Sequence, residues 1–425
     1  MPTNPDREPS DRADPAPKFP TRLSLDDART RIVELAAARP TSLESIAIEC
    51  SLGRVLAQDV RAPFDVPGFA NSAMDGYAVR HADLDASEST RLHLLGVTLA
   101  GGQAAPAAVA GGCVRITTGA RLPEGADTIV IKEDTTVDGN WIHVAAGARA
   151  GANVRAAGED YRAGDLALSR GATLTPARIG ALASFGMREI AVARKPRAVL
   201  LTTGDELVAP GQPLGAGQIH DSNRYSLGGL LEQAGVDLVR HERLRDEPDS
   251  LRAALARASG DAEMIMTSGG VSAGEADYLP GLLAQIGEVH FWKVRIKPGL
   301  PFLCGSIGRT FVFALPGNPV SGIATFLALV KPGIDAMIGR GESPPRLRAR
   351  LAWAIHKHHD RTELLRATIE CDASGVLHAT PLPKQGSGML AGVADASVLV
   401  RIPEAAGVYG EGFVVEILPL PTALG

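Results

Sequence analysis

The sequence predicts a multidomain protein of the α/β and β classes, in which a parallel-sheet α/β domain spans residues 196–340. Three observations predict it. The 425 residues of the chain exceed the roughly 250–300 residues at which a single hydrophobic core stops growing. Between residues 196 and 340, strand-like and helix-like segments alternate, as they do in a sheet covered by helices on both faces. Short β-like segments dominate residues 62–158 and 343–425, which favours two mostly β domains.

The N-terminal 20 residues are rich in proline and mixed charge and have no apolar stretch of the signal-peptide type, so we expect a disordered leader. A helix is expected next, because Ser24 can cap it with Asp27 at its third position and Pro40 stops it. A second helical stretch, TPARIGALASFG, precedes residue 195. We expect both stretches to pack together in a helical scaffold domain formed by residues 21–61 and 159–195, which encloses a β-rich insert domain of residues 62–158.

Strands and helices follow in turn through the α/β domain. The strand-like segments are RAVLLTTG, VDLVRHERL, EMIMTSGG, VHFWKVRI and RTFVFALPG. Apolar residues at helical spacing lie between them, at 227/230/231/234, 251/254/255/258 and 279/282/283/286. After residue 343, the segments RLRARLAWAI, ELLRATIEC, GVLHATPLP, ASVLVRIPE and FVVEILPL predict a small C-terminal β-barrel or sandwich.

Composition excludes several classes of function. The net charge of −5 and pI of about 6.1 give no basic field for nucleic acid or lipid headgroups, so neither is expected as a partner. No run of 18 or more apolar residues is present, so no membrane-spanning helix is expected. The four cysteines lie far apart without a C-x-x-C pair, which suits a cytoplasmic protein better than a disulfide framework or a zinc ribbon.

Three glycine-containing loops follow strands of the α/β domain: TTGDE at 202–206, TSGGVSAGEAD at 267–277 and LPGNPVSG at 315–322. Glycine lets backbone N–H groups approach an oxyanion closely, and a helix N-terminus adds unpaired donors. In the third loop, Asn318 suits the N-cap and Pro319 the first helical position. A tight turn alone would explain any one loop, but three together predict a site for a phosphorylated, anionic small molecule. Its expected binding residues are Thr203, Gly204, Ser268, Gly269, Gly270, Gly317 and Asn318.

Carboxylates in these loops would repel a phosphate unless a cation lies between them. Mg²⁺ fits, because it takes one or two carboxylates and completes its octahedron with phosphate oxygens and water. The carboxylates concerned are Asp205, Glu206, Asp246 and Asp277. On the next strand, Lys293 and Lys297 are spaced so that both would face one side and clamp an anion, although a solvated strand edge would also explain them.

An ordered set of motifs makes the prediction of function specific. These motifs are PFDVPGFANSAMDGYA, ITTGARLPEGADTIVIKED, GANVRAAGEDYRAGD, LLTTGDELV, TSGGVSAGEADY, KPG-x-P and LPGNPVSG. Over about residues 23–420, the chain resembles the MoeA/gephyrin family of molybdopterin molybdenumtransferases, whose α/β domain is similar to the MoaB/MogA proteins. The resemblance implies molybdenum insertion from molybdate into adenylylated molybdopterin, with Mg²⁺-dependent hydrolysis that releases AMP. It also implies an elongated homodimer, with the site between the insert domain of one subunit and the α/β domain of the other.

The resemblance also implies roles for individual residues. Catalytic roles fall on Asp75, Thr118, Glu206, Asp246, Asp277, Lys293 and Lys297. Mg²⁺ ligands fall on Asp205, Glu206, Asp246 and Asp277. Cofactor binding extends to Pro316, Pro319, Ser321, Arg366 and Ser387, of which Arg366 and Ser387 help to form the molybdate pocket in relatives. For Asp75 and Thr118, hydrogen bonding to the local backbone in turns is the alternative.

Leu300 departs from the family pattern, because the family usually has a second lysine in K-P-G-K-P. This change removes a positive charge from the molybdate pocket. Weaker molybdate binding, compensation by Arg295 and preference for a related oxyanion all remain open. The cluster at 356–360, HKHHD, is interpreted as a solvated strand end rather than a metal site.

Two other functions remain as alternatives. One is molybdopterin adenylyltransferase, as in isolated MoaB/MogA-like domains, although the flanking domains argue against it. The other is a non-enzymatic molybdopterin-binding scaffold. A MogA-like adenylyltransferase is a candidate partner of the chain.

Overall fold

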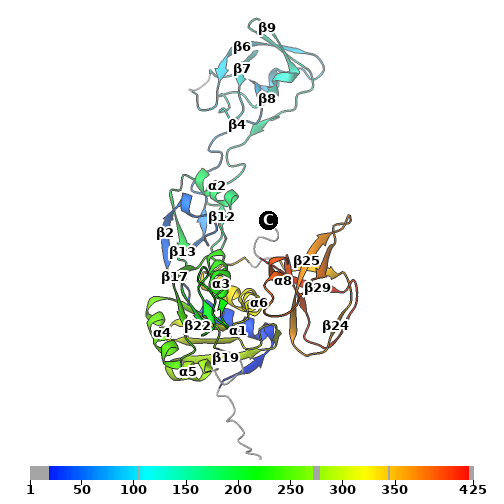
Figure 1. Cartoon of the computed structure of the whole chain (residues 1–425). Helices are drawn as coiled ribbons and strands as arrows, with labels where there is room; N and C mark the ends of the chain where they lie inside the picture. Colours follow the sequence, from blue (N-terminus) through cyan, green and yellow to red (C-terminus); the bar gives the residue numbers. More distant parts are fainter. Residues whose placement is uncertain (1–18, 103–105, 271–277, 343–344, 421–425) are drawn as a thin grey trace, which may run out of the picture. The chain divides into compact units, whose positions relative to one another are not determined.

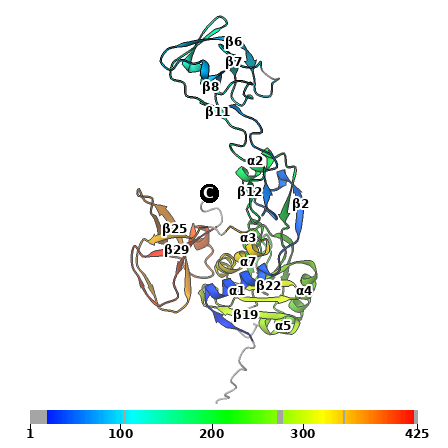
Figure 2. The same ribbon diagram turned by 180° about the vertical axis from the view of Figure 1, so that it is seen from behind.

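The computed structural model describes residues 19–102, 106–270, 278–342 and 345–420. The chain divides into two compact units (Figures 1 and 2). Unit 1 consists of Met1–Glu44 with Ala193–Gly425, and unit 2 consists of Ser45–Val192. Each unit is built around its own hydrophobic cores.

A seven-stranded sheet with the order β1-β19-β21-β22-β18-β14-β17 forms the centre of the α/β domain in unit 1. Its strands are β1 (Thr21–Leu23), β14 (Arg197–Thr203), β17 (Asp237–Leu244), β18 (Met264–Ser268), β19 (Glu288–Val294), β21 (Leu303–Ile307) and β22 (Thr310–Leu315). The neighbours β22, β18, β14 and β17 are parallel, but β21 is antiparallel to both β19 and β22. The predicted parallel sheet is therefore interrupted at β21, an additional antiparallel strand between β19 and β22 that the sequence did not predict.

Helices cover both faces of this sheet, as the alternation predicted (Figure 1). On one face, α4 (Pro248–Asp261) and α5 (Leu279–Ile286) bury residues such as Leu255 and Leu283. The other face is covered by α1 (Leu25–Ala37), α3 (Asn223–Gln233), α6 (Pro319–Thr325) and α7 (Lys331–Met337). The short strands β15 (Leu207–Val208) and β16 (Ile219–His220) pair with each other before α3.

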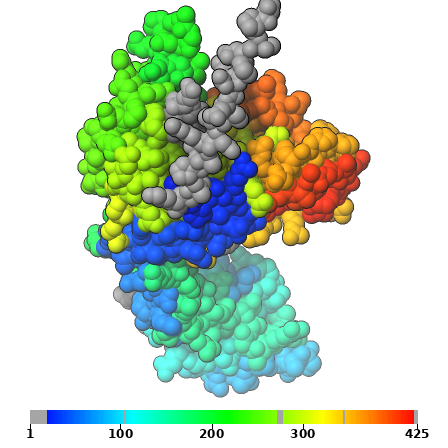
Figure 3. Space-filling model, turned by 90° about the horizontal axis from the view of Figure 1, so that it is seen from below, coloured from blue at the N-terminus to red at the C-terminus, as the bar shows by residue number. Residues whose placement is uncertain are grey.

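The N-terminal helix forms as predicted but packs elsewhere. Ser24 caps α1 by accepting a hydrogen bond from the Asp27 backbone N–H at 3.1 Å. The buried face of α1, including Ile32, lies in the core of the α/β domain and contacts α7. Figure 3 shows this blue segment against both the α/β domain and the orange and red C-terminal domain, where Arg401 donates to Asp26. The expectation that α1 packs with the second helical stretch in a scaffold domain is thus wrong.

A continuous helical stretch, Pro319–Met337, crosses the core of unit 1. Within it, a π-helical turn at Phe326–Val330 joins α6 to α7 next to Pro332, which cannot donate its backbone nitrogen to the preceding turn. Among the described residues, this stretch is long and apolar enough to cross a membrane by length and composition alone, but 78% of its apolar window is buried inside the chain, as in a core helix. Its apolar side chains are part of the sheet's core.

The C-terminal domain of unit 1 is a closed five-stranded barrel, and each of the predicted strands is present. The barrel strands are β23 (Leu347–Leu351), β25 (Thr362–Cys371), β26 (Leu377–Pro381), β27 (Val398–Ile402) and β29 (Val414–Pro419). Pairing of β25 with β27 closes the ring. The short strand β20 (Ile296–Lys297) adds to β25 and connects the two domains of the unit. Beside the barrel lie β24 (Ile355–Lys357), β28 (Gly407–Tyr409) and α8 (Ala391–Ala394).

Unit 2 contains two groups of elements with separate cores. The helix α2 (Pro176–Ser184) packs on short strands through residues such as Leu56 and Leu182. These strands are β2 (Leu43–Ala47), β3 (Val60–Arg61), β12 (Leu166–Leu168) and β13 (Glu189–Ala193). The six-stranded sheet β8-β5-β7-β6-β10-β9 forms the other group. Its strands are β5 (Gly76–Val79), β6 (Thr90–Thr98), β7 (Gly112–Ile116), β8 (Thr128–Ile131), β9 (Thr135–Asp138) and β10 (Trp141–Val144), and the pair β4 (Asn71–Ser72) and β11 (Val154–Arg155) adjoins it.

Candidate functional site

A cavity of about 1020 Å³ lies in unit 1 where the α/β domain meets the barrel. The carboxyl ends of the parallel strands β14, β18 and β22 meet at one edge of the sheet, so the loops that follow them reach the same cavity. The predicted ligand-binding residues that line it are Thr203, Ser268, Gly269, Gly270, Pro316, Gly317, Asn318, Pro319, Ser321 and Ser387. Gly204 does not line the cavity.

The second and third loops approach each other through glycines. Gly269 has a φ of +102°, and a Cβ atom there would lie 2.5 Å from Thr203 Oγ1 and 2.8 Å from the Thr203 carbonyl oxygen. A Cβ on Gly317 would lie 3.6 Å from the Gly269 Cα. The backbone at Gly269 can therefore take this course only without a side chain, whereas a Cβ at Gly317 would make ordinary van der Waals contact.

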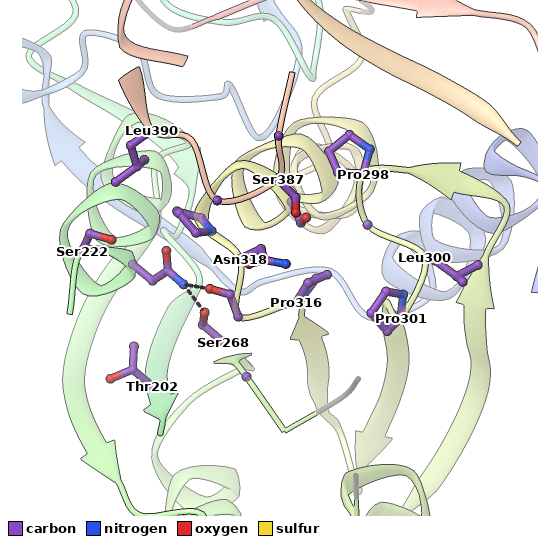
Figure 4. A pocket seen from close by; sticks show the side chains of 18 of the residues that line it. Thr202, Ser222, Ser268, Pro298, Leu300, Pro301, Pro316, Asn318, Ser387 and Leu390 are labelled. Carbon is purple, nitrogen blue, oxygen red and sulfur yellow. Dashed lines mark hydrogen bonds between the residues drawn. The ribbon is translucent and has the colours of Figure 1, made fainter. Parts of the chain in front are cut away.

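One amide joins these loops to the start of α3. The Nδ2 group of Asn223 donates to Ser268 Oγ at 2.8 Å and to the Gly317 carbonyl oxygen at 2.6 Å (dashed in Figure 4). Asn223 and Ser268 are 8% and 2% exposed. Three chain segments are thus fixed relative to one another by a single buried side chain.

The third loop begins α6, although its cap differs from the expectation. Asn318 occupies the N-cap and Pro319 the first turn, as predicted, but the Asn318 side chain makes no capping hydrogen bond. Instead, the Val320 backbone N–H donates to the Ser387 carbonyl oxygen at 3.1 Å. The barrel loop that carries Ser387 therefore takes up a donor of the first helical turn, and Figure 4 shows Ser387 beside Asn318.

Of the predicted carboxylates, Glu206 and Asp246 line the cavity, and both are exposed to solvent. Asp205 does not line it, and Asp277 lies outside the described residues. Burial raises the pKa of Tyr278, and the neighbouring carboxylates of Asp246 and Asp205 raise it further. Asp246 and Asp205 therefore act electrostatically on the same hydroxyl, although only Asp246 faces the cavity.

The two predicted lysines are not on one face of one strand. Lys293 has a φ of +65° near the end of β19, whereas Lys297 belongs to β20 in the barrel sheet. This break ends the alternation on which the predicted clamp depended. Lys293 Nζ lies 4.0 Å from the centre of the Trp292 ring and does not line the cavity. Lys297 does line it, and its Nζ lies 2.8 Å from Glu363 Oε1, across the β20–β25 register.

Arg361 is a cavity-lining cation that the sequence reading missed. No ion pair or side-chain hydrogen bond of its guanidinium occurs among the described residues. It shares the cavity wall with Leu300, the position where the family lysine is absent. Arg295, the cation first considered as compensation, pairs with Glu404 at 2.9 Å and does not line the cavity.

Arg366 was expected to help form a molybdate pocket, but it does not face the cavity. The side chain is completely buried and does not line the cavity. Its Nε and Nη2 groups donate to the Lys384 carbonyl oxygen at 3.1 and 2.6 Å, and its backbone N–H donates to Gln385. Burial lowers the pKa of Arg366. Arg366 therefore supports the loop that carries Ser387, and Nη1 is left without a partner among the described residues.

In unit 2, Asp75 and Thr118 lie together. Asp75 Oδ1 accepts hydrogen bonds from the Thr118 backbone N–H at 2.8 Å and from its hydroxyl at 2.9 Å. These bonds lower the pKa of Asp75, with the backbone donor contributing most. The pair joins the turn before β5 to the turn after β7, 43 residues further along the chain, so it differs from the bonding to the local backbone that was considered as the alternative.

Comparison with known proteins identifies the chain. Residues 23–186 match the MoeA N-terminal region (domain I and II), residues 199–336 a probable molybdopterin binding domain, and residues 348–420 the MoeA C-terminal region (domain IV). The chain belongs to the MoeA family. A molybdopterin molybdenumtransferase from Haemophilus influenzae is 36% identical over 95% of this chain and 100% of its own length. One from a Nostoc species is 32% identical over 87% of each chain.

A solved MoeA structure agrees with the fold. The molybdopterin biosynthesis MoeA protein of Pyrococcus horikoshii superposes with a TM-score of 0.81 at 26% identity, covering 94% of this chain and 100% of that one. As a MoeA family member, the chain thus matches its relatives along almost its whole length, including the domains on either side of the α/β domain.

The histidine-rich cluster of this MoeA family chain forms no metal centre within the described residues. His356 and His358 are exposed, as expected of a strand end. Lys357 between them is only 3% exposed, and its Nζ donates at 2.6 Å to the carbonyl oxygens of His359 and Glu404. Burial lowers the pKa of Lys357. The lysine is therefore a buried structural link beside the barrel rather than part of a solvated end.

Proposed function

We propose that this chain is a molybdopterin molybdenumtransferase, which inserts molybdenum from molybdate into adenylylated molybdopterin and releases AMP. The observation that carries the proposal is the cavity at the carboxyl ends of the parallel strands, lined by all three glycine-containing loops. Support also comes from relatives called molybdopterin molybdenumtransferases at 30–36% identity. Because those relatives cover the flanking domains too, the adenylyltransferase and scaffold alternatives are not favoured.

The cavity has two chemically different ends. Figure 4 shows Thr202 and Ser222 on one side and Pro298, Leu300 and Pro301 on the opposite side. Glu206, in the loop that follows Thr202, and Lys297, which precedes Pro298, both line the cavity. We assign the phosphates of the substrate to the first end, where glycine backbone and hydroxyl groups would bind them. Molybdate belongs at the second end, where Lys297 and Arg361 would neutralise its charge through charge-assisted hydrogen bonds.

The first end suits Mg²⁺ by the chemistry of its donors. Mg²⁺ is usually held by one or two carboxylates, with phosphate oxygens and water as the other ligands. The described residues contain no cluster of three or more metal-binding side chains, so an all-protein cage is not expected. Glu206 and Asp246 would hold the ion together with the substrate. When bound, Mg²⁺ would offset the phosphate charge and polarise the pyrophosphate link that is hydrolysed.

The proposal includes a homodimer in which Asp75 and Thr118 of one subunit complete the cavity of the other. Its support is the family resemblance, together with the exposure of the Asp75 carboxylate. We further propose a cytoplasmic location and a MogA-like adenylyltransferase as the source of the substrate. The four cysteines of the chain are unpaired, which suits a reducing compartment.

The test is AMP release by the purified chain supplied with adenylylated molybdopterin, Mg²⁺ and molybdate. We expect release that requires both ions and is accompanied by formation of molybdenum cofactor. Asp246→Ala should abolish it, whereas Asp261→Ala, at the end of α4, is a matched control that should not. Absence of AMP release from the unmodified chain would refute the proposal, and formation of adenylylated molybdopterin from ATP would favour the adenylyltransferase.

A further inference from the structure

Asn223 donates a hydrogen bond to the hydroxyl of Ser268 at 2.8 Å. An amide nitrogen has two hydrogens, and both are used, one by Ser268 Oγ and the other by the Gly317 carbonyl oxygen. Ser268 is therefore an acceptor in its contact with Asn223. Its own hydrogen has no acceptor among the described residues, although the side chain lines the cavity.

The orientation of the amide is fixed by its surroundings. A carbonyl oxygen is an acceptor only, so turning the amide over would place Oδ1 against the Gly317 oxygen at a separation of about 2.6 Å. Oδ1 in the present orientation is buried without a partner among the described residues. The two donor bonds thus hold Asn223 in place even though an acceptor is left unsatisfied, and a freely turning amide is not expected at 8% exposure.

We propose that Asn223 is a positioning residue, which makes Ser268 a hydrogen-bond donor to a phosphate oxygen of the bound substrate. The proposal rests on the proposed function for the identity of the ligand. Ser268 ends β18 immediately before Gly269 and Gly270, so its hydroxyl lies at the start of the loop expected to hold phosphate. Accepting a bond from the amide also polarises the hydroxyl and strengthens the bond that it donates. A carboxylate at position 223 would reverse this arrangement, because it would take the hydrogen from Ser268.

The test is a double-mutant cycle with Asn223→Asp, Ser268→Ala and the double variant, measured as kcat/KM for AMP release. Each single variant should lose roughly 10- to 100-fold, as expected for one hydrogen bond to a charged group. In the Ser268→Ala background, the further loss caused by Asn223→Asp should be several-fold smaller, because only the contact with the Gly317 carbonyl oxygen remains to be disturbed. Losses that multiply would overturn the proposal and leave Asn223 as a structural link only.

Asn223→Ala separates positioning from folding. This variant frees the Ser268 hydroxyl without capturing its hydrogen, so it should lose less activity than the nearly isosteric Asn223→Asp. A purely structural role predicts that this difference between the two variants persists in the Ser268→Ala background, because Asn223→Asp also places an oxygen against the Gly317 carbonyl oxygen. Titration calorimetry with inorganic pyrophosphate and Mg²⁺ measures the same double-mutant cycle as binding affinities, without catalytic turnover. A chain that releases no AMP but shows a coupled cycle in binding would refute the proposed function alone, and independent losses in binding as well as in AMP release would refute this inference alone.

Discussion

Replacing Gly269 by alanine tests whether the second loop is held in the conformation that opens the cavity. An L-residue at a φ of +102° would carry strain of about 1–3 kcal/mol. The new Cβ would also lie 2.8 Å from the Thr203 carbonyl oxygen, a backbone atom at the end of β14 that cannot rotate away. Overpacking of this kind adds about 1–3 kcal/mol. We therefore expect unit 1 to lose about 2–6 kcal/mol of unfolding free energy.

The assay must observe unit 1 alone, because chains with several domains do not unfold in a single transition. Trp141 is in unit 2, whereas Trp292 and Trp353 are in unit 1. In a Trp141→Phe background, tryptophan fluorescence during urea unfolding therefore follows unit 1. The control is Gly229→Ala inside α3, where a Cβ meets nothing within 4 Å and should stabilise the helix by about 0.5–1 kcal/mol. If the two alanine variants were equally stable, the reasoning about the loop would be wrong.

Three further predictions concern charge. Arg361→Ala should weaken molybdate binding roughly tenfold or more, and more strongly at low than at high salt, whereas Lys293→Ala should change it little; titration calorimetry at two salt concentrations measures both. Leu300→Lys should lower the molybdate concentration that gives half-maximal AMP release, while Leu300→Met should not, and an unchanged value would show that Arg361 already supplies the charge. Thr118→Ala should raise the pKa of Asp75, and NMR titration of the carboxyl group measures this change. Since the depressed pKa of Asp75 contributes stability that is lost as the pH falls through it, unit 2 of this variant should depend less on pH in the acid range.

Local sequence patterns predicted individual helices and strands well, but they did not predict which elements pack against each other. Ser24 and Asp27 suffice to start α1, because a cap depends only on neighbouring residues. An apolar helix face, however, does not specify which core it enters, and the face of α1 that contains Ile32 lies against the α/β sheet. The extra strand β21 was missed because Leu303–Ile307 is short and follows a proline-rich turn, so periodicity had little length on which to act.

In the candidate site too, features that depend on local sequence were predicted, and features that depend on contacts between distant residues were not. The glycine-containing loops were predicted because their glycine, asparagine and proline residues themselves indicate the backbone conformation that such loops require. Asn223 and Arg361 carry no local pattern that separates them from an ordinary helix start or a strand flank, and the burial of Asn223 is seen only in the structure. Lys293 and Lys297 show the reverse error, since their spacing suggested one strand face while the break at φ +65° places them in different sheets.

The positions of the charged residues in the cavity decide whether Leu300, which replaces the usual family lysine, affects binding of molybdate or of the phosphates. The cavity carboxylates Glu206 and Asp246 and the cations Lys297 and Arg361 come from different elements, and the loop of Pro298 and Leu300 lies opposite Thr202 (Figure 4). The loss of a positive charge at position 300 therefore matters mainly at the second end of the cavity, near Lys297 and Arg361. Its effect on the first end is reduced by distance and by salt. The carboxylate of Glu363, 2.8 Å from Lys297, already offsets part of the charge at the second end. Arg361 is then the principal unopposed cation at that end among the described residues, so discrimination between oxyanions should depend more on Arg361 than on Lys297.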